Sequence, residues 1–575
     1  MANKVPASDP LHSEGPETKR SGSPAAGGPG MTEAQGKQCS RSGGPGGTKA
    51  TTRILVSDPL DEEGLDILKK SGFPVDEVSG LTEDELCARI GDYDALIIRS
   101  GTKVTRKVID AGKRLKVIGR AGVGVDNVDI PYATDRGILV MNTPSANILS
   151  AAEHSCAMLL AVARNIPFAH ESMHRGEWKR SKYTGVELNG KVLGIIGVGR
   201  VGGEVAKRMK SFNMTMVGYD PYLPKEVADS LGVRLTTLEE VISTADFMTI
   251  HTPLLPETRN MISLPQFKMM KPNARIANVA RGGIVNEDDL YTALKEGIIA
   301  GAAFDVWCNE PLTDSEKKLL ELENLVTTPH LGASTVEAQK RVAIEVSEHA
   351  VMFLRDGIVS NAVNAPRGSL DKDTEPFVPL AKSMGCIIRQ MVGSHPLNKL
   401  EIYYCGNLAK KQNKMLTVNA VIGYLEGIIG TANIINALPV AKSKGLEVVE
   451  SAGDDSKYYS SIIDMKFTYG GATHSLRGTV IGESPKIIGI DEFATDITIA
   501  DKMIFVKYKD TPGVIGIVGN AIGEVGINIA HMAVGRANGM ATMFLTVDQD
   551  APAEVLDKIA DKLGVEAISY IKIEQ

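Results

Sequence analysis

Residues 191–203, KVLGIIGVGRVGG, decide the fold. A short apolar run leads directly into Gly197, Gly199 and Gly202, which have the spacing G-x-G-x-x-G, and a helical pattern follows at once. The first glycine permits a tight turn, the second lets a pyrophosphate approach the backbone, and the third lets the helix pack close to the strand. The free N–H groups at the helix N-terminus then favour an anion. Glycine-rich turns are common, so the motif alone fits a purely structural turn as well.

An acidic residue after the next predicted strand favours a dinucleotide site over a purely structural turn. The next predicted strand, residues 215–220, ends with Asp220, 18 residues after Gly202. A carboxylate at this place can accept both hydroxyls of the adenosine ribose, and it would repel a 2′-phosphate. Strand, glycines, helix, strand and acid in this order predict a Rossmann domain that binds NAD rather than NADP.

Strands alternate with helices on both sides of this stretch. Residues 53–60, 95–99 and 116–119 read as strands of a first α/β unit with a parallel sheet, and a second set begins with an apolar helix near residue 151. A long helical pattern covers residues 335–355. The pattern then changes to a different α+β unit, and residues 503–573 read βαββαβ, which is the ferredoxin-like plan and suits a regulatory module.

The N-terminal segment differs from the rest. Of the first 50 residues, 22 are Gly, Pro or Ser, and none is Ile, Phe, Tyr or Trp. Such a segment cannot bury enough apolar surface to offset its ordering entropy, so we expect residues 1–52 to form a disordered tail. Met31 is an alternative start of the chain.

Composition excludes several classes of function. The length of 575 residues predicts three to five domains, and 63 Lys and Arg against 70 Asp and Glu give a net charge of −7, without the basic excess that nucleic-acid binding needs. No apolar run approaches the length of a membrane span, and no secretory signal is evident. The six cysteines form no C-x-x-C pair, which is typical of a reducing compartment without a structural zinc site. We therefore expect a cytoplasmic protein.

Three polar residues follow predicted strands downstream of the glycines. Arg281 stands in A-R-G-G, Glu310 in N-E-P and His330 in P-H-L-G-A-S. Their types suit the oxidation of a 2-hydroxy acid, in which His330 accepts the hydroxyl proton, Glu310 fixes its tautomer and Arg281 grips the substrate carboxylate. On chemistry alone, Arg281 also fits a surface arginine at a strand end, and Glu310 one half of an exposed ion pair.

The stretch His170–His174 spells H-E-x-x-H, which places two imidazoles on one helical face as in zinc proteases. Arg175 and Gly176 follow as a helix stop, and no third ligand comes after them. We expect no metal site here.

Several motifs together carry a family resemblance. The glycine turn, A-R-G-G-I-V, N-E-P and P-H-L-G-A-S-T-x-E-A-Q resemble the D-isomer-specific 2-hydroxyacid dehydrogenases. The stretches V-x-G-R-A-G-x-G-V-D-N-V-D (117–129), N-T-P (142–144) and H-T-P-L-L-P (251–256) are similar to the branch that oxidises 3-phospho-D-glycerate to 3-phosphohydroxypyruvate at the entry to L-serine synthesis. The similarity covers roughly residues 53–365, and the remainder resembles the long form of that branch.

The resemblance implies an interrupted order of domains. It places a Rossmann NAD-binding domain at 148–331 inside a flavodoxin-like substrate domain formed by 53–147 and 332–364. An α+β intervening domain at 365–499 and a ferredoxin-like ACT regulatory domain at 500–575 follow.

The resemblance also assigns roles to individual residues. Arg281, Glu310 and His330 form the catalytic set, and the substrate is bound by Arg99, Ser100, Arg120, Asn147 and, from the neighbouring subunit, Arg180. Besides the three glycines and Asp220, NAD contacts Arg200, Val201, Thr252, Pro253, Ala280, Asp305 and Gly332. Val123 departs from the family, which often has a hydroxyl residue there, so one cofactor-phosphate contact has to come from backbone.

Regulation and assembly are further implications. ACT domains of this enzyme type bind L-serine between paired subunits, here at Tyr508, Asp510 and Asn528, although Asp510 also fits a helix cap and Asn528 a turn. The resemblance implies a homodimer or homotetramer. Two rivals remain: another D-2-hydroxyacid dehydrogenase, such as a glyoxylate or hydroxypyruvate reductase, and a non-catalytic NAD(H)-sensing binding protein.

Overall fold

The computed structural model describes residues 51–366, 371–393, 395–429, 432–454, 458–469 and 471–573. Except for its last two residues, the expected N-terminal tail, with Met31, lies outside the described residues. No helix in the described ranges is long and apolar enough to cross a membrane.

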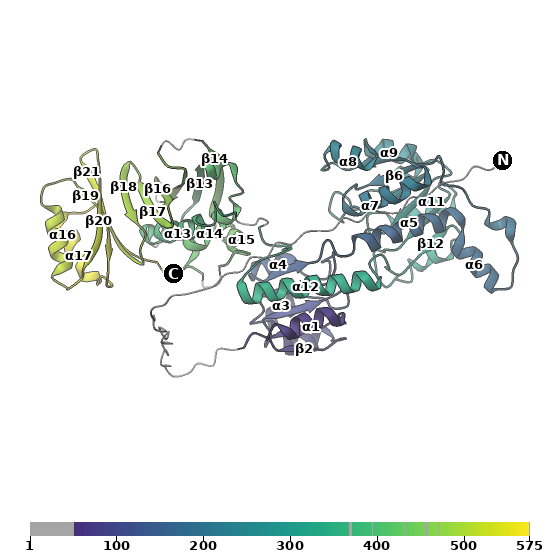
Figure 1. Ribbon diagram of the computed structural model, residues 1–575, viewed down its shortest axis with the longest axis horizontal. Helices are drawn as coiled ribbons and strands as arrows, with labels where there is room; N and C mark the ends of the chain where they lie inside the picture. The colour runs from purple at the N-terminus through teal and green to yellow at the C-terminus, as the bar shows by residue number, and fades with distance from the viewer. Residues whose placement is uncertain are drawn as a thin grey trace, which may run out of the picture. The chain divides into compact units, whose positions relative to one another are not determined.

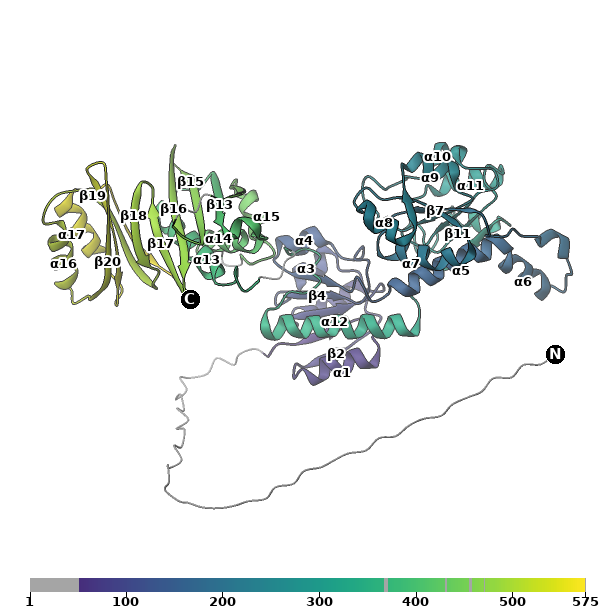
Figure 2. The same ribbon diagram turned by 45° about the horizontal axis from the view of Figure 1, so that its top comes forward.

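The first sheet has five parallel strands in the order β2-β1-β3-β4-β5, which is the flavodoxin-like order. Every residue of β3 is buried, as expected of a strand covered by helices on both faces. Helix α12 packs against α1 and β4, and Figure 2 shows α1 and α12 side by side. The strands are β1 Ile54–Val56, β2 Val75–Glu77, β3 Ala95–Ile98, β4 Val117–Arg120 and β5 Leu139–Asn142, and the helices are α1 Glu62–Lys70, α2 Glu83–Ile90, α3 Arg106–Ala111, α4 Ile130–Asp135 and α12 Val336–Asp356.

The second sheet has seven parallel strands in the order β12-β11-β10-β9-β6-β7-β8. Counted from β6, this is the Rossmann order 3-2-1-4-5-6 with one strand added. Its strands are β6 Val192–Ile196, β7 Thr215–Tyr219, β8 Val233–Leu235, β9 Phe247–Ile250, β10 Arg275–Asn278, β11 Gly301–Phe304 and β12 Leu325–Thr327.

Helices α5 and α7 pack against each other, and α5 also contacts β10, β11 and β12. The chain enters this unit through α5 and returns through α12 to the first sheet, so the second unit interrupts the first (Figure 1). The helices are α5 Ile148–Arg164, α6 Ile166–His174, η1 Arg180–Tyr183, α7 Arg200–Met209, η2 Lys210–Phe212, α8 Lys225–Leu231, α9 Leu238–Thr244, α10 Leu264–Met269, α11 Glu287–Lys295 and η3 Lys317–Glu321.

Two further sheets follow. The first has six strands in the order β14-β13-β15-β16-β17-β18 and is antiparallel except for the pair β13–β14, and α13 packs against α14 and β16. Its elements are α13 Phe377–Val392, β13 Lys399–Gly406, η4 Asn407–Lys410, α14 Lys414–Leu425, α15 Ala437–Ser443, β14 Glu447–Gly453, β15 Ser461–Tyr469, β16 Ala472–Ile481, β17 Ser484–Ile490 and β18 Phe493–Thr498.

The last sheet is antiparallel in the order β20-β21-β19-β22, and α16 and α17 pack against each other beside it (Figure 1). In chain order this is βαββαβ with strands arranged 4-1-3-2, so the predicted ferredoxin-like unit is confirmed. Its elements are β19 Lys502–Lys509, α16 Val514–Gly523, β20 Ile529–Ala537, β21 Met540–Val547, α17 Ala553–Leu563 and β22 Ala567–Lys572.

Candidate active site

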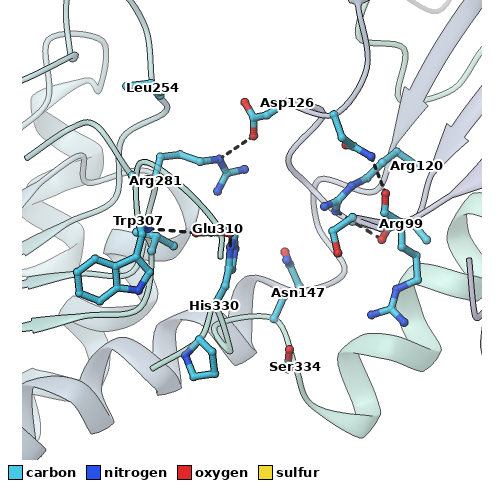
Figure 3. Close-up of a pocket in the computed structure, with 18 of the residues that line it drawn as sticks. Arg99, Arg120, Asp126, Asn147, Leu254, Arg281, Trp307, Glu310, His330 and Ser334 are labelled. Atoms are coloured by element: carbon cyan, nitrogen blue, oxygen red, sulfur yellow. Dashed lines mark hydrogen bonds and ion pairs between the residues drawn. The ribbon is translucent and has the colours of Figure 1, made fainter. Parts of the chain in front are cut away.

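A pocket of about 630 Å³ lies where loops from both parallel sheets meet. Figure 3 shows Arg281, Glu310 and His330 on one side of it and Arg99 and Arg120 on the other. These residues follow or end strands of the two sheets, at the carboxyl edge where open α/β sheets bind ligands. The pocket is lined by seven residues that the sequence predicted: Arg99, Ser100, Arg120, Asn147, Arg281, Glu310 and His330.

His330 and Glu310 form a close pair. The His330 Nδ1 lies 2.7 Å from Glu310 Oε2, while Glu310 Oε1 accepts the Trp307 N–H at 3.1 Å. Burial raises the pKa of Glu310, but the hydrogen bonds from His330 and Trp307 outweigh it and hold that pKa below its ordinary value. An ionised carboxylate only accepts hydrogen bonds, so the pair assigns the proton to Nδ1 and leaves the Nε2 lone pair for a substrate.

The turn that carries His330 has an unusual backbone. His330 has φ of 56°, in the left-handed region that non-glycine residues seldom adopt. Asp305 holds this turn: its carbonyl accepts the His330 N–H at 2.8 Å, and its carboxylate accepts the Leu331 and Gly332 N–H groups at 2.7 and 2.8 Å.

Several arginine side chains place positive charge at the pocket. Burial, with repulsion from Arg281 and Arg99, lowers the pKa of Arg120 to about 10. The Arg120 Nε is buried and has no hydrogen-bond partner among the described residues. Arg281 donates to the Ala280 carbonyl at 2.7 Å and pairs with Asp126 at 3.2 Å. Such a cluster is costly without an anion and is well suited to bind one.

The glycine turn has the geometry that a dinucleotide needs. Gly197 has φ of 87°, and a Cβ on it would lie 2.8 Å from the His251 carbonyl oxygen. A Cβ on Gly202 would lie 2.1 Å from the Gly197 carbonyl oxygen, so the helix can approach the strand only with glycine there. A Cβ on Gly199 would meet no atom within 4 Å, which leaves that side open to a pyrophosphate at the start of α7.

Asp220 lies directly after β7 and is held by backbone. Its Oδ2 accepts the Val198 N–H at 3.0 Å, and its Oδ1 accepts the Tyr222 and Leu223 N–H groups. The Thr252 hydroxyl, beside the glycine turn, is buried and has no partner among the described groups, which fits a contact to a bound cofactor. The remaining predicted NAD contacts lie around this edge: Arg200 and Val201 in the first turn of α7, Pro253 after β9, Ala280 after β10, Asp305 after β11 and Gly332 after β12.

The pocket also contains residues that the sequence did not single out. Lys103, Asp126, Trp307 and Cys308 line it as well. Lys103 lies four residues after the predicted ligand Arg99, and Asp126 lies within the motif at residues 117–129 that carried the resemblance, so position near a predicted ligand was the available signal. Trp307 and Cys308 follow β11 and precede Glu310.

Other predicted residues do not line this pocket. Arg180 is exposed in η1. In the C-terminal unit Tyr508 is buried in the core, Asp510 lies 3.5 Å from Arg536, and Asn528 donates to Asp548 at 2.7 Å.

Two histidine motifs have ordinary structural explanations. Helix α6 ends at His174, whose ring centroid lies 4.3 Å from that of His170, and Glu171 pairs with Arg175. No group of three or more potential metal ligands occurs in the part of the chain that the structure describes. His251 bonds to Thr249 at 3.0 Å, and burial lowers its pKa to about 4, so it is neutral at physiological pH.

Family models match three parts of the chain. Residues 156–332 match the NAD binding domain of D-isomer specific 2-hydroxyacid dehydrogenases, residues 373–491 the D-3-phosphoglycerate dehydrogenase intervening domain, and residues 502–564 the ACT domain.

Curated proteins match over most of the chain. The D-3-phosphoglycerate dehydrogenase of Methanocaldococcus jannaschii is 43% identical over 527 residues, which cover 91% of this chain and all of that protein. The Bacillus subtilis enzyme of the same name is 38% identical, with 91% and 99% covered. Among solved structures, the TT0316 protein of Thermus thermophilus is 34% identical with a TM-score of 0.50, and covers 54% of this chain and 100% of its own. A glyoxylate reductase from Paecilomyes thermophila is 26% identical with a TM-score of 0.51, with 55% and 99% covered.

Proposed function

Because the chain belongs to the D-3-phosphoglycerate dehydrogenase family, an NAD-dependent oxidoreductase family, we propose that it oxidises 3-phospho-D-glycerate to 3-phosphohydroxypyruvate, the first step of L-serine biosynthesis. We propose further that Arg281, Glu310 and His330 carry the chemistry. The observation that supports this most is the His330–Glu310 pair, 2.7 Å apart, in a pocket that three arginines also line.

Proton transfer is the task of His330. Nε2 accepts the proton of the C2 hydroxyl as the carbonyl forms, and the resulting imidazolium is stabilised by the Glu310 carboxylate at Nδ1. Glu310 is suited to this role because its own pKa is held low, which keeps it ionised at neutral pH. NAD, when bound at the glycine turn, supplies the acceptor for the hydride that leaves C2.

Substrate charge is balanced by the arginines. Arg281 binds the carboxylate and polarises the developing carbonyl, while Arg99 and Arg120 across the pocket bind the remaining negative charge of a phosphorylated acid. Asn147 and Ser100 supply polar contacts between them. An unphosphorylated substrate would leave the partly buried Arg120 guanidinium without an anion, and this favours 3-phosphoglycerate over the substrates of the rival reductases.

The finer features belong to the same proposal. The domain boundaries are those that the family resemblance implies. The protein is a cytoplasmic homodimer or homotetramer in which Arg180 reaches the neighbouring subunit's site. L-serine binds between paired ACT domains at Tyr508, Asp510 and Asn528 and inhibits the enzyme. If saturating L-serine changes neither the rate nor the oligomeric state, this regulatory part is wrong.

The test is NADH formation from NAD with 3-phosphoglycerate, D-glycerate and D-lactate, at alkaline pH because the reaction releases a proton. Wild-type protein is compared with Arg120→Met, and with Arg136→Met as a matched control, since Arg136 pairs with Asp110 outside the pocket. We expect turnover with the phosphorylated acid, strongly reduced in Arg120→Met and retained in Arg136→Met.

Two results would change the proposed function. Turnover with unphosphorylated acids only would favour the rival reductases. Binding of NADH without turnover of any acid would favour the non-catalytic binding protein.

A further inference from the structure

A second histidine lies behind the catalytic turn. His154, on α5, places its Nε2 3.2 Å from Asp305 Oδ1 and 3.2 Å from the Thr328 hydroxyl. Thr328 in turn donates to the same Asp305 oxygen at 2.6 Å. The Asp305 side chain is fully buried, so its charge depends on these donors and on the turn that it holds.

Asp305 connects His154 to the active site. Three successive N–H groups, those of His330, Leu331 and Gly332, donate to Asp305. These bonds hold His330 in its left-handed conformation, which costs free energy unless the surroundings fix it. Burial raises the pKa of Asp305, but hydrogen bonds from His154, Thr328 and the Leu331 N–H outweigh it and keep the carboxyl ionised.

Helix α5 joins the catalytic segment at a second point. The Ser150 hydroxyl lies 2.7 Å from that of Thr335, and Ser150 is one helical turn before His154, on the same face. Asn147, which lines the pocket, directly precedes the helix. One rigid element therefore borders the substrate pocket at its start and supports the His330 segment over its next two turns.

We propose that His154 is a positioning residue for the oxidation: by donating from Nε2 to Asp305 it fixes the turn of residues 330–332 and thereby aims His330 Nε2 at the substrate. This inference rests on the proposed function for its kinetic consequence only. Among the described hydrogen bonds Oδ2 of Asp305 accepts only from Gly332, so the same carboxylate keeps capacity for a cofactor contact.

The test compares His154→Leu, which removes the donor, with His154→Gln, whose amide nitrogen can take the place of Nε2. Ser155→Ala is the matched control on the same helix, because among the described residues the Ser155 hydroxyl donates to the Ala151 carbonyl alone. We expect His154→Leu to lower kcat for 3-phosphoglycerate by about tenfold, the effect of losing one hydrogen bond to a charged group at a positioned base. We expect KM for NAD to stay within about twofold. His154→Gln should recover most of the rate, and Ser155→Ala should behave as wild type.

Amide hydrogen exchange of the segment that contains residues 330–332 provides a readout independent of activity. We expect faster exchange there in His154→Leu and near-wild-type exchange in His154→Gln. Wild-type kcat with unchanged exchange in His154→Leu would overturn the inference, and so would a loss that His154→Gln does not recover. A wild-type protein without dehydrogenase activity but with His154-dependent exchange would instead count against the proposed function alone.

Discussion

Arg120 should destabilise the ligand-free protein. It ends β4 with a partly buried guanidinium whose Nε is buried and has no partner among the described residues, and burial with repulsion from Arg281 and Arg99 lowers its pKa well below the ordinary value, to about 10. At neutral pH the guanidinium is charged in both the folded and the unfolded chain. The lowering of its pKa on folding therefore measures the free energy that the folded protein loses by holding this charge. It corresponds to about 3.4 kcal/mol at most, and water in the pocket reduces this cost to about 1–3 kcal/mol.

Replacing Arg120 by Met removes the charge and keeps an unbranched side chain of similar length. We expect Arg120→Met to raise the thermal midpoint of the ligand-free protein by several degrees, at about 2–4 °C per kcal/mol. The sign with pH follows from linkage: the unfolded chain binds more protons only between the folded and the unfolded pKa, so the penalty is fully present below pH 10 and disappears as pH rises above it. The difference between variant and wild type should therefore be constant from about pH 6 to 9.

The same substitution should weaken the substrate. We expect kcat/KM for 3-phosphoglycerate to fall by roughly 10- to 100-fold, from the loss of a charge-assisted contact of about 1.5–3 kcal/mol. The assay is thermal unfolding followed by fluorescence, with and without 3-phosphoglycerate, together with steady-state kinetics. An Arg120→Met protein that is less stable than wild type without ligand, or that 3-phosphoglycerate stabilises equally, would refute the reasoning.

Three other substitutions test neighbouring parts of the site. His330→Asn should lower kcat by about 10²–10⁴-fold, with NADH binding measured by fluorescence unchanged, and a smaller loss would count against a base at this position. Asp220→Ser should raise kcat/KM for NADP relative to NAD, and an unchanged ratio would mean that the ribose hydroxyls are recognised elsewhere. Burial and Glu287 raise the pKa of the Cys308 thiol to about 12. Iodoacetamide should therefore alkylate Cys308 slowly at pH 8, and faster in Glu287→Gln. Mass spectrometry that finds Cys308 alkylated as fast as a free thiol would contradict this.

The parts of the fold that the sequence predicted are those fixed by local constraint. The turn at Gly197 needs a positive φ, and the close approach at Gly202 excludes any side chain, so both leave a signature in residue type. Strands such as β3 and β6 lie in the interior of their sheets and appear as apolar runs. The edge strands β2 and β8 have three residues each, with the sequences VDE and VRL, and show no such pattern.

The parts that could not be predicted depend on tertiary contacts. The resemblance predicts Asp305 as a cofactor contact, but its hold on the His330 turn comes from hydrogen bonds to groups 23–27 residues away. His154 lies in a helix that the sequence presents as an apolar core helix, and only the fold brings it to Asp305. Asp126 likewise meets Arg281 across the pocket from a distant segment.

The central claim is that this pocket recognises a phosphorylated 2-oxo or 2-hydroxy acid through arginines on both sides. The most direct measurement is the ratio of kcat/KM for 3-phosphohydroxypyruvate to that for hydroxypyruvate, with NADH as the reductant. The account predicts a ratio of at least about 100, because the phosphate adds charge-assisted contacts worth roughly 3 kcal/mol or more. It also predicts that the ratio falls towards one in Arg120→Met. Equal rates for the two acids in the wild-type protein would contradict it.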